Sequence, residues 1–194
     1  YQHQAALAAR LLARGQAASF PFDATLAEAT IARLAPIADT DEQAESDAGD
    51  EIAREALRVG LRRSLAVVTG GPGTGKPTMV ARLIALLVEM AAGKGEPAPR
   101  VKLLAPTGKA AAAMANAFAR GRDVLEVSQE VRDALPRSAE TIHRALHGQT
   151  RLDAFGRPQA VLIDADVVVI DEASMVDLEL MSRLIAACES VPRV

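Results

Sequence analysis

The sequence predicts an α/β fold in which helices cover both faces of a parallel sheet, preceded by a small helical N-terminal region. Three short apolar runs, 65–69, 101–105 and 166–171, alternate with stretches whose large apolar residues recur at helical spacing. Continuous apolar runs of this length are typical of strands that are buried on both faces. Because strands that alternate with helices are joined by right-handed crossovers, we expect the three runs to form one parallel sheet.

The N-terminal part is expected to contain two helices and a linker. The first helix, over 1–14, ends at a glycine, and the second, over 24–35, stops at a proline. Residues 38–51 are acidic and lack large apolar side chains, so we expect a flexible, solvated linker there. A helical pattern resumes over 52–63 and leads into the α/β part. The predicted domains are 1–37, 38–51 and 52–194.

The helices of the α/β part follow the strands in order. Apolar residues at helical spacing predict a helix around 79–87, and an alanine-rich helix follows over 107–120. The stretch 121–160 is less regular and partly helical. A final helix over 180–188 carries the apolar stripe that includes Cys188, the single cysteine, which we therefore expect to be a buried core thiol.

Composition narrows the class of protein. Hydrophobic residues make up 49% of the chain and aromatic residues only 3%, so alanine, leucine and valine must build the core. Neither a membrane span nor a secretory signal is visible, so a cytoplasmic protein without membrane partners is the expectation. Residues 1–60 hold five basic and ten acidic residues, whereas 61–194 hold seventeen and fifteen. The net charges of −5 and +2 suggest two parts with different roles.

A glycine-rich loop between the first apolar run and its helix is the strongest local signal. From Gly70 to Lys76 the sequence satisfies the pattern G-x-x-x-x-G-K, and a strand before it and a helix after it are the required context. Glycines let successive N–H groups point inward at an anion, and the lysine reaches the β- and γ-phosphates of a nucleotide. A glycine-rich turn without ligand is the alternative. The expected phosphate-binding residues are Gly70, Gly71, Pro72, Gly73, Thr74, Gly75, Lys76, Pro77 and Thr78.

An acidic pair at the end of the third run would complete an ATP site. Asp171 and Glu172 follow four apolar strand residues. In such a site Asp171 would hold Mg²⁺ and Glu172 would orient the attacking water, so the expected catalytic residues are Lys76, Asp171 and Glu172. Adjacent acidic residues also occur by chance in loops; the upstream phosphate loop favours the functional interpretation.

Four segments together resemble one family: "AVVTGGPGTGK", "LLAPTGKAAAAMANA", "TIHRALH" and "VVVIDEASMVDLELM". In this order and spacing they are similar to the RecD-type DNA helicases, superfamily 1 motors that include the α subunit of exodeoxyribonuclease V. The resemblance covers about 61–194 and implies a P-loop NTPase (RecA-like) fold, here the first RecA-like domain over 52–194. It also implies a 5′-to-3′ translocase on single-stranded DNA, driven by ATP and Mg²⁺, that works with nuclease and helicase subunits in double-strand break repair and recombination.

Two of these segments are expected to contact DNA. Pro106, Thr107, Gly108 and Lys109 combine a hydroxyl, backbone N–H groups and a helix start, which suits a DNA phosphate. The resemblance places Thr141, His143 and Arg144 near the DNA path. An ordinary strand-to-helix turn and a structural histidine are the alternatives.

The sequence departs from the family pattern at Pro77, where a threonine or serine would ligate Mg²⁺. Proline removes that hydroxyl and a backbone N–H, although it fits the first turn of a helix. We therefore expect a normal helix, weakened Mg·ATP binding and much weaker hydrolysis. The chain is also expected to be truncated at its C-terminal end, before the second RecA-like domain. Two alternatives remain: another P-loop ATPase of AAA type, and a degenerate P-loop module that docks partner subunits.

Overall fold

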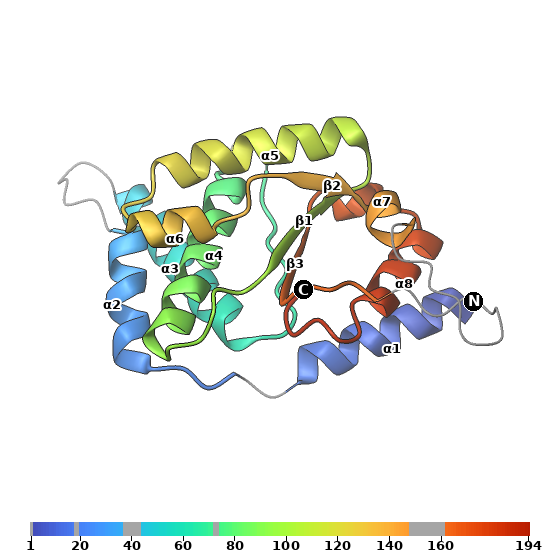
Figure 1. The fold of residues 1–194 in the computed structure, drawn as a ribbon, viewed down its shortest axis with the longest axis horizontal. Helices are drawn as coiled ribbons and strands as arrows, with labels where there is room; N and C mark the ends of the chain where they lie inside the picture. Colours follow the sequence, from blue (N-terminus) through green and yellow to red (C-terminus); the bar gives the residue numbers. More distant parts are fainter. Residues whose placement is uncertain (1, 18–19, 37–43, 72–73, 148–161) are drawn as a thin grey trace. The chain divides into compact units, whose positions relative to one another are not determined.

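The computed structural model describes residues 2–17, 20–36, 44–71, 74–147 and 162–194, with the backbone alone for 2, 3 and 44–50. The elements in chain order are α1 (Gln2–Gln16), α2 (Ala24–Leu34), α3 (Ala44–Arg62), α4 (Lys76–Gly93), β1 (Val101–Ala105), α5 (Gly108–Asp123), α6 (Gln129–Ala134), β2 (Ala139–Thr141), α7 (Ile142–His147), β3 (Val167–Ile170), the 3-10 turn η1 (Ala173–Met175) and α8 (Leu178–Ala187). Figure 1 shows them along the chain. No helix in these ranges is long and apolar enough to cross a bilayer.

The chain divides into two compact units that are interleaved along the sequence. The sheet unit comprises 1–17, 100–116 and 136–194, and the helical unit comprises 18–99 and 117–135. Each unit is a group of residues in contact with one another. This division does not test the predicted domain boundaries 1–37, 38–51 and 52–194, which stay a prediction.

The sheet unit contains three parallel strands in the order β2-β1-β3. Leu104 of β1 lies opposite Glu140 of β2 and Ile170 of β3. Leu103 and Ala105, which alternate with Leu104 along β1, are buried as well, so this central strand is covered on both faces. The α/β class with a parallel sheet is therefore confirmed.

One face of the sheet is covered by α7 and α8. Leu104 and Val168 form a single core cluster with apolar residues of these helices, among them Ile142 and Leu184. Cys188, expected to be a core thiol, is completely buried in this cluster. The one-turn repeat of buried residues along α8 explains why the apolar stripe predicted this helix.

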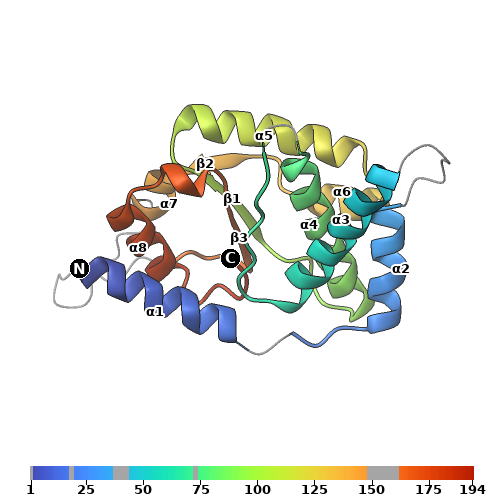
Figure 2. The same cartoon turned by 180° about the vertical axis from the view of Figure 1, so that it is seen from behind.

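Helix α1 lies against α8, as Figures 1 and 2 both show. The Arg14 guanidinium, in the last turns of α1, donates hydrogen bonds to the carbonyl oxygens of Cys188 and, at 2.9 Å, Val191. These carbonyls follow the C-terminal end of α8, where free acceptors and the negative end of the helix dipole favour a cation. Arg14 therefore joins the first helix to the last one.

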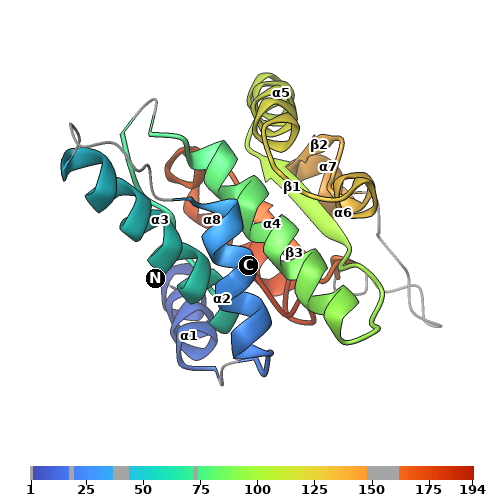
Figure 3. The same cartoon turned by 90° about the vertical axis from the view of Figure 1, so that its left-hand side faces the viewer.

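The helical unit is organised around α4, against which α2, α3 and α6 pack (Figure 3). Helix α4 is buried along much of its length, including Ala81, Ile84 and Leu86. It ends in a Schellman motif: the Glu96 N–H donates to the Ala91 carbonyl and the Gly95 N–H to the Ala92 carbonyl. Gly95 has φ +69°, a left-handed conformation that glycine adopts without strain.

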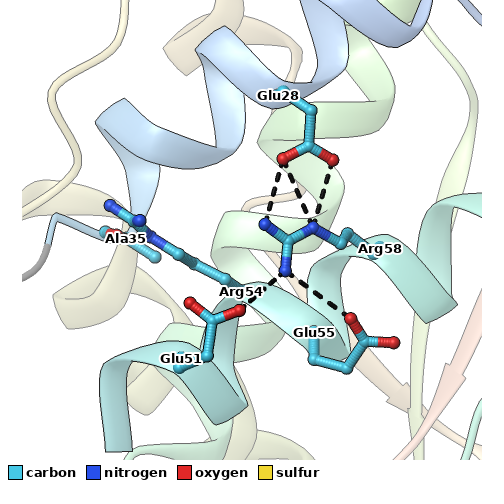
Figure 4. A network of polar contacts seen from close by, with 6 residues as sticks. All are labelled: Glu28, Ala35, Glu51, Arg54, Glu55 and Arg58. Atoms are coloured by element: carbon cyan, nitrogen blue, oxygen red, sulfur yellow. Dashed lines mark hydrogen bonds and ion pairs between the residues drawn. The ribbon is translucent and has the colours of Figure 1, made fainter. Parts of the chain in front are cut away.

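Helices α2 and α3 are also joined by charge (Figure 4). The Arg58 guanidinium of α3 lies 3.0 Å from a Glu28 carboxylate oxygen of α2 and 2.9 Å from Glu51 within its own helix. The hydrogen bond from Arg58 holds the pKa of Glu28 below its usual value. Arg54 adds a bond from Nε to the Ala35 carbonyl at 2.8 Å, just after α2 ends.

The structure corrects the prediction of a strand over 65–69. This run forms neither strand nor helix, and the side chains of Val67 and Val68 are 78% and 41% exposed. An apolar run shows that a segment is suited to a buried strand. A strand forms only where a neighbouring strand hydrogen-bonds to its backbone N–H and C=O groups. The strands of the described residues all lie in the sheet unit, where β2 and β3 pair with β1.

Two other differences concern boundaries. Helix α3 begins at Ala44, so the backbone is helical over 44–51, where we expected a flexible linker. Alanine and glutamate are good helix formers, and acidic residues are favourable in the first turns of a helix. The strand β2 lies inside the stretch 121–160, where we expected helix and irregular structure. Residues 148–161 lie outside the described residues.

Candidate functional site

Three of the four sequence motifs lie at the carboxyl end of the sheet. Ala105, the last residue of β1, pairs with Thr141, the last of β2, and Leu104 pairs with Ile170, the last of β3. The segments 106–109, 141–144 and 171–172 therefore leave the sheet side by side. Figure 1 shows the arrowheads of β1 and β2 ending close together, where the chain turns into α5 and α7. In open parallel sheets this is the edge where ligands bind.

Thr107 and Thr141 each begin a helix at this edge. The Thr107 hydroxyl oxygen accepts a hydrogen bond from the Ala110 N–H at 3.1 Å, and the Thr141 hydroxyl oxygen accepts one from the Arg144 N–H at 3.1 Å. Both are N-caps three residues before the donor. The structural role that we considered for Thr107 is therefore present, and each hydroxyl proton remains free to donate to an anion.

The groups around these caps face solvent. Gly108 and Lys109, expected to contact a DNA phosphate, are exposed, and Pro106 is half-buried. Gly108 is the first residue of α5, so its backbone N–H has no intrahelical partner, and nothing lies within 4 Å of the position that a Cβ would take there. His143 and Arg144 are exposed on α7. Their contact with DNA stays a prediction.

Asp171 and Glu172 follow β3 directly. The Asp171 N–H donates to the Leu104 carbonyl at 2.9 Å, which ties the residue to the neighbouring strand. One Asp171 carboxylate oxygen accepts from the Glu172 N–H at 2.9 Å, and the other is available to a cation. No described basic side chain pairs with either carboxylate. Oxygen donors of this kind are those that Mg²⁺ prefers.

Glu172 has an unusual backbone. Its φ of 50° and ψ of 40° are left-handed, and it is the one non-glycine residue with positive φ among the described residues. Such a conformation costs about 1–2 kcal/mol for an L-residue. Strained residues of this kind cluster at functional sites, and Glu172 is exposed where a water could reach it.

The phosphate loop belongs to the helical unit, and its described residues curl around the lysine. The Lys76 ammonium donates to the carbonyl oxygens of Gly70 and Gly71, at 2.7 and 2.8 Å, and the Thr74 hydroxyl also donates to Gly71. A Cβ at Gly70 would lie 2.6 Å from the Thr74 hydroxyl, so a larger residue there would displace the Thr74 side chain. A bound phosphate would compete with these carbonyls for the ammonium. Pro72 and Gly73 lie outside the described residues.

Helix α4 starts normally in spite of the proline. Gly75, with φ +76°, is the N-cap, and its carbonyl accepts the Met79 N–H at 2.9 Å. Pro77 occupies the first turn, where an N–H has no intrahelical partner. The expectation that the helix survives Pro77 is confirmed. Thr78 follows on α4 and is half-buried.

Sequence reasoning missed Gly121, which packs against the start of α4. A Cβ built on Gly121 would lie 3.1 Å from the Thr78 Cα and 3.4 Å from the Pro77 carbonyl oxygen. The close approach of α5 to the first turn of α4 therefore depends on glycine. A glycine in the last turn of an otherwise alanine-rich helix was the only signal.

Comparisons with known proteins agree with this picture. A family model described as an AAA domain matches residues 53–193. The chain belongs to the AAA domain family. Its phosphate loop and this membership imply that it binds nucleotide.

Several curated relatives carry the same name. The chain is 45% identical over 148 residues to "RecBCD enzyme subunit RecD" of Mycolicibacterium smegmatis, which covers 76% of this chain and 26% of that protein. RecD of Mycobacterium tuberculosis is 45% identical over 134 residues (69% and 23%), and RecD of Haemophilus influenzae is 35% identical over 148 residues (72% and 22%). The predicted resemblance to the RecD family is confirmed, and the chain spans about a quarter of the length of these relatives.

Proposed function

We propose that this chain is the ATP-binding part of a RecD-type DNA helicase or translocase that acts in double-strand break repair and recombination. Its ligands would be ATP, Mg²⁺ and single-stranded DNA. Its partners would be the nuclease and helicase subunits of an exodeoxyribonuclease V-like complex in the cytoplasm. The observation that carries the proposal is the phosphate loop folded around Lys76 at the start of α4, in a chain 45% identical to RecD subunits.

The roles of the residues follow from their chemistry. Lys76 and the N–H groups of the loop would bind the nucleotide phosphates. Asp171 would hold Mg²⁺, and Glu172 would orient the attacking water. DNA phosphates would be bound at the starts of α5 and α7 by Thr107, Lys109 and Arg144, which contact the backbone without reading bases.

Pro77 would impair this chemistry without disturbing the helix. The residue lacks the hydroxyl that would ligate Mg²⁺ and the N–H that would face a phosphate. Losing one hydrogen bond to a charged group is worth about 1.5–3 kcal/mol, which corresponds to a roughly ten- to hundredfold loss. The chain would therefore hold nucleotide weakly and hydrolyse it slowly.

Nucleotide binding and DNA-stimulated hydrolysis test the proposal in the full chain, in Pro77→Thr and in the matched control Lys76→Ala. We expect Pro77→Thr to bind Mg·ATP at least about tenfold more tightly and to hydrolyse it faster, since it regains one charge-assisted contact. Lys76→Ala should lose binding. If Pro77→Thr gains nothing, the explanation of the defect is wrong.

Single-stranded DNA separates the remaining alternatives. Stimulation of hydrolysis by DNA, weakened in Thr107→Ala and Arg144→Ala, is the result expected of a RecD-type motor. Hydrolysis in Pro77→Thr that ignores DNA would favour another AAA-type ATPase. The presence of Pro77 favours the other alternative, a degenerate module that docks partner subunits. In that case neither the unaltered chain nor Pro77→Thr would hydrolyse ATP.

A further inference from the structure

Two histidines lie together on the solvent face of α7. His143 and His147 are both exposed, and their rings are nearly parallel, with an interplanar angle of 12° and centroids 6.5 Å apart. Between them, Ala145 and Leu146 are buried in the core of the sheet unit. The inward side chains fix the rotation of the helix, so both imidazoles must point outward.

The spacing of the pair is that of a chelate. Residues four apart on a helix are neighbours on one face, whereas adjacent residues point in different directions. A divalent ion binds imidazole nitrogen at about 2.0–2.1 Å, so one ion held between two rings needs centroids about 6 Å apart or less. Exposed side chains cover the small remaining difference by rotation about χ1 and χ2.

The ring nitrogens of the pair are also available. In the part of the chain that the structure describes, neither ring forms a hydrogen bond or an ion pair, and each ring lies next to the other. Nitrogen of a neutral imidazole is a ligand for zinc, copper and nickel rather than for Mg²⁺ or Ca²⁺. The chemistry of the pair therefore differs from that of Asp171.

We propose that His143 and His147 form a two-histidine site for a divalent transition-metal ion of the Zn²⁺, Ni²⁺ and Cu²⁺ class. Water would fill the other coordination positions, because no three histidine, cysteine, aspartate or glutamate side chains of the described residues group around an ion. The neighbouring Arg144 points to a different side of the helix. The site shares His143 with the residues that are expected to lie near DNA.

Calorimetric titration of Ni²⁺ into the untagged full chain tests the proposal. The only other histidine is His3, so His3→Ala serves as the background and removes any binding near the first residues. We expect one ion per chain in this background. His147→Ala should bind at least about tenfold more weakly, because even the loss of an outer-shell partner typically has that effect.

A variant with the same number of imidazoles tests the spacing. Arg144→His combined with His147→Ala places two histidines at adjacent positions, and binding should again fall at least tenfold. In the His3→Ala background, Zn²⁺ should also shift the ring proton NMR signals of both histidines at a single stoichiometry. The proposal is overturned if His147→Ala or the adjacent pair binds as tightly as the background, if two ions bind independently, or if His3→Ala abolishes binding. Circular dichroism would show that each variant is folded.

Discussion

The end of α4 offers a quantitative test of the backbone geometry. At Gly95 the chain turns with φ +69° and closes the Schellman motif through the bonds to Ala91 and Ala92. We expect Gly95→Ala to destabilise the protein. A Cβ at Gly95 would meet nothing within 4 Å, so the effect is one of backbone conformation alone and not of steric overlap with neighbours.

The magnitude follows from two opposing terms. The left-handed conformation costs about 1–2 kcal/mol for alanine. About 0.4–1 kcal/mol of this is regained, because alanine lowers the conformational entropy of the unfolded chain. The free energy of unfolding should therefore fall by about 1 kcal/mol, which lowers Tm by roughly 2–4 °C in a chain of this size.

Urea unfolding followed by circular dichroism measures the effect, and two variants control it. Gly95→Asn should cost less, since asparagine tolerates the left-handed region. Gly15→Ala should stabilise by up to about 1 kcal/mol, because Gly15 lies inside α1 with ordinary φ and open space around it. If Gly95→Ala raises the midpoint as Gly15→Ala does, the assignment of the Schellman motif is refuted.

Three further outcomes are expected. Leu184→Ala should lower the free energy of unfolding by about 2–5 kcal/mol in a urea titration, since Leu184 is fully buried in the sheet-unit core; a loss below 1 kcal/mol would contradict that packing. Burial raises the pKa of the Cys188 thiol to about 11, so iodoacetamide at pH 8 should label the thiol only after urea unfolds the chain; rapid labelling of the native protein would count against the buried position. Hydrogen bonds from Arg100 hold the pKa of Asp166 below its usual value, so this pair adds stability above the unfolded pKa near 4 and loses it as the pH falls through the folded pKa; Arg100→Ala should flatten the acid side of the stability profile, and an unchanged profile would argue against the pair.

The strands show what a sequence can and cannot specify. The runs containing β1 and β3 were predicted because both are mostly apolar, and Leu103, Leu104, Ala105, Val167 and Val168 are indeed buried. Residues 65–69 have the same composition and form no strand, since composition does not say which segments pair. The strand β2 has three residues, only partly buried, and its extended conformation comes from pairing with β1.

The candidate site also was predicted only where it depends on local sequence. The loop around Lys76 and the acidic pair after β3 are local patterns. The residues that flank each motif in the sequence are enough to predict its local conformation. The register that brings Thr141 beside Ala105 is a tertiary fact and could not be predicted. The contact of Gly121 with the first turn of α4 is also a tertiary contact. The rest of α4 and the strand β1 lie between these residues in the sequence, so no local pattern predicts it.

The bonds from Arg14 to the carbonyls that follow α8 have a consequence for synthesis. Val191 follows Arg14 by 177 residues, so α1 leaves the ribosome long before the segment on which it packs exists. At a synthesis rate of about 5–20 residues per second, α1 is made roughly ten to thirty-five seconds before the segment that it packs against. Nascent chains halted before α8 should therefore expose α1 to proteases and chaperones, and protection of that helix should appear only when α8 and Val191 have emerged.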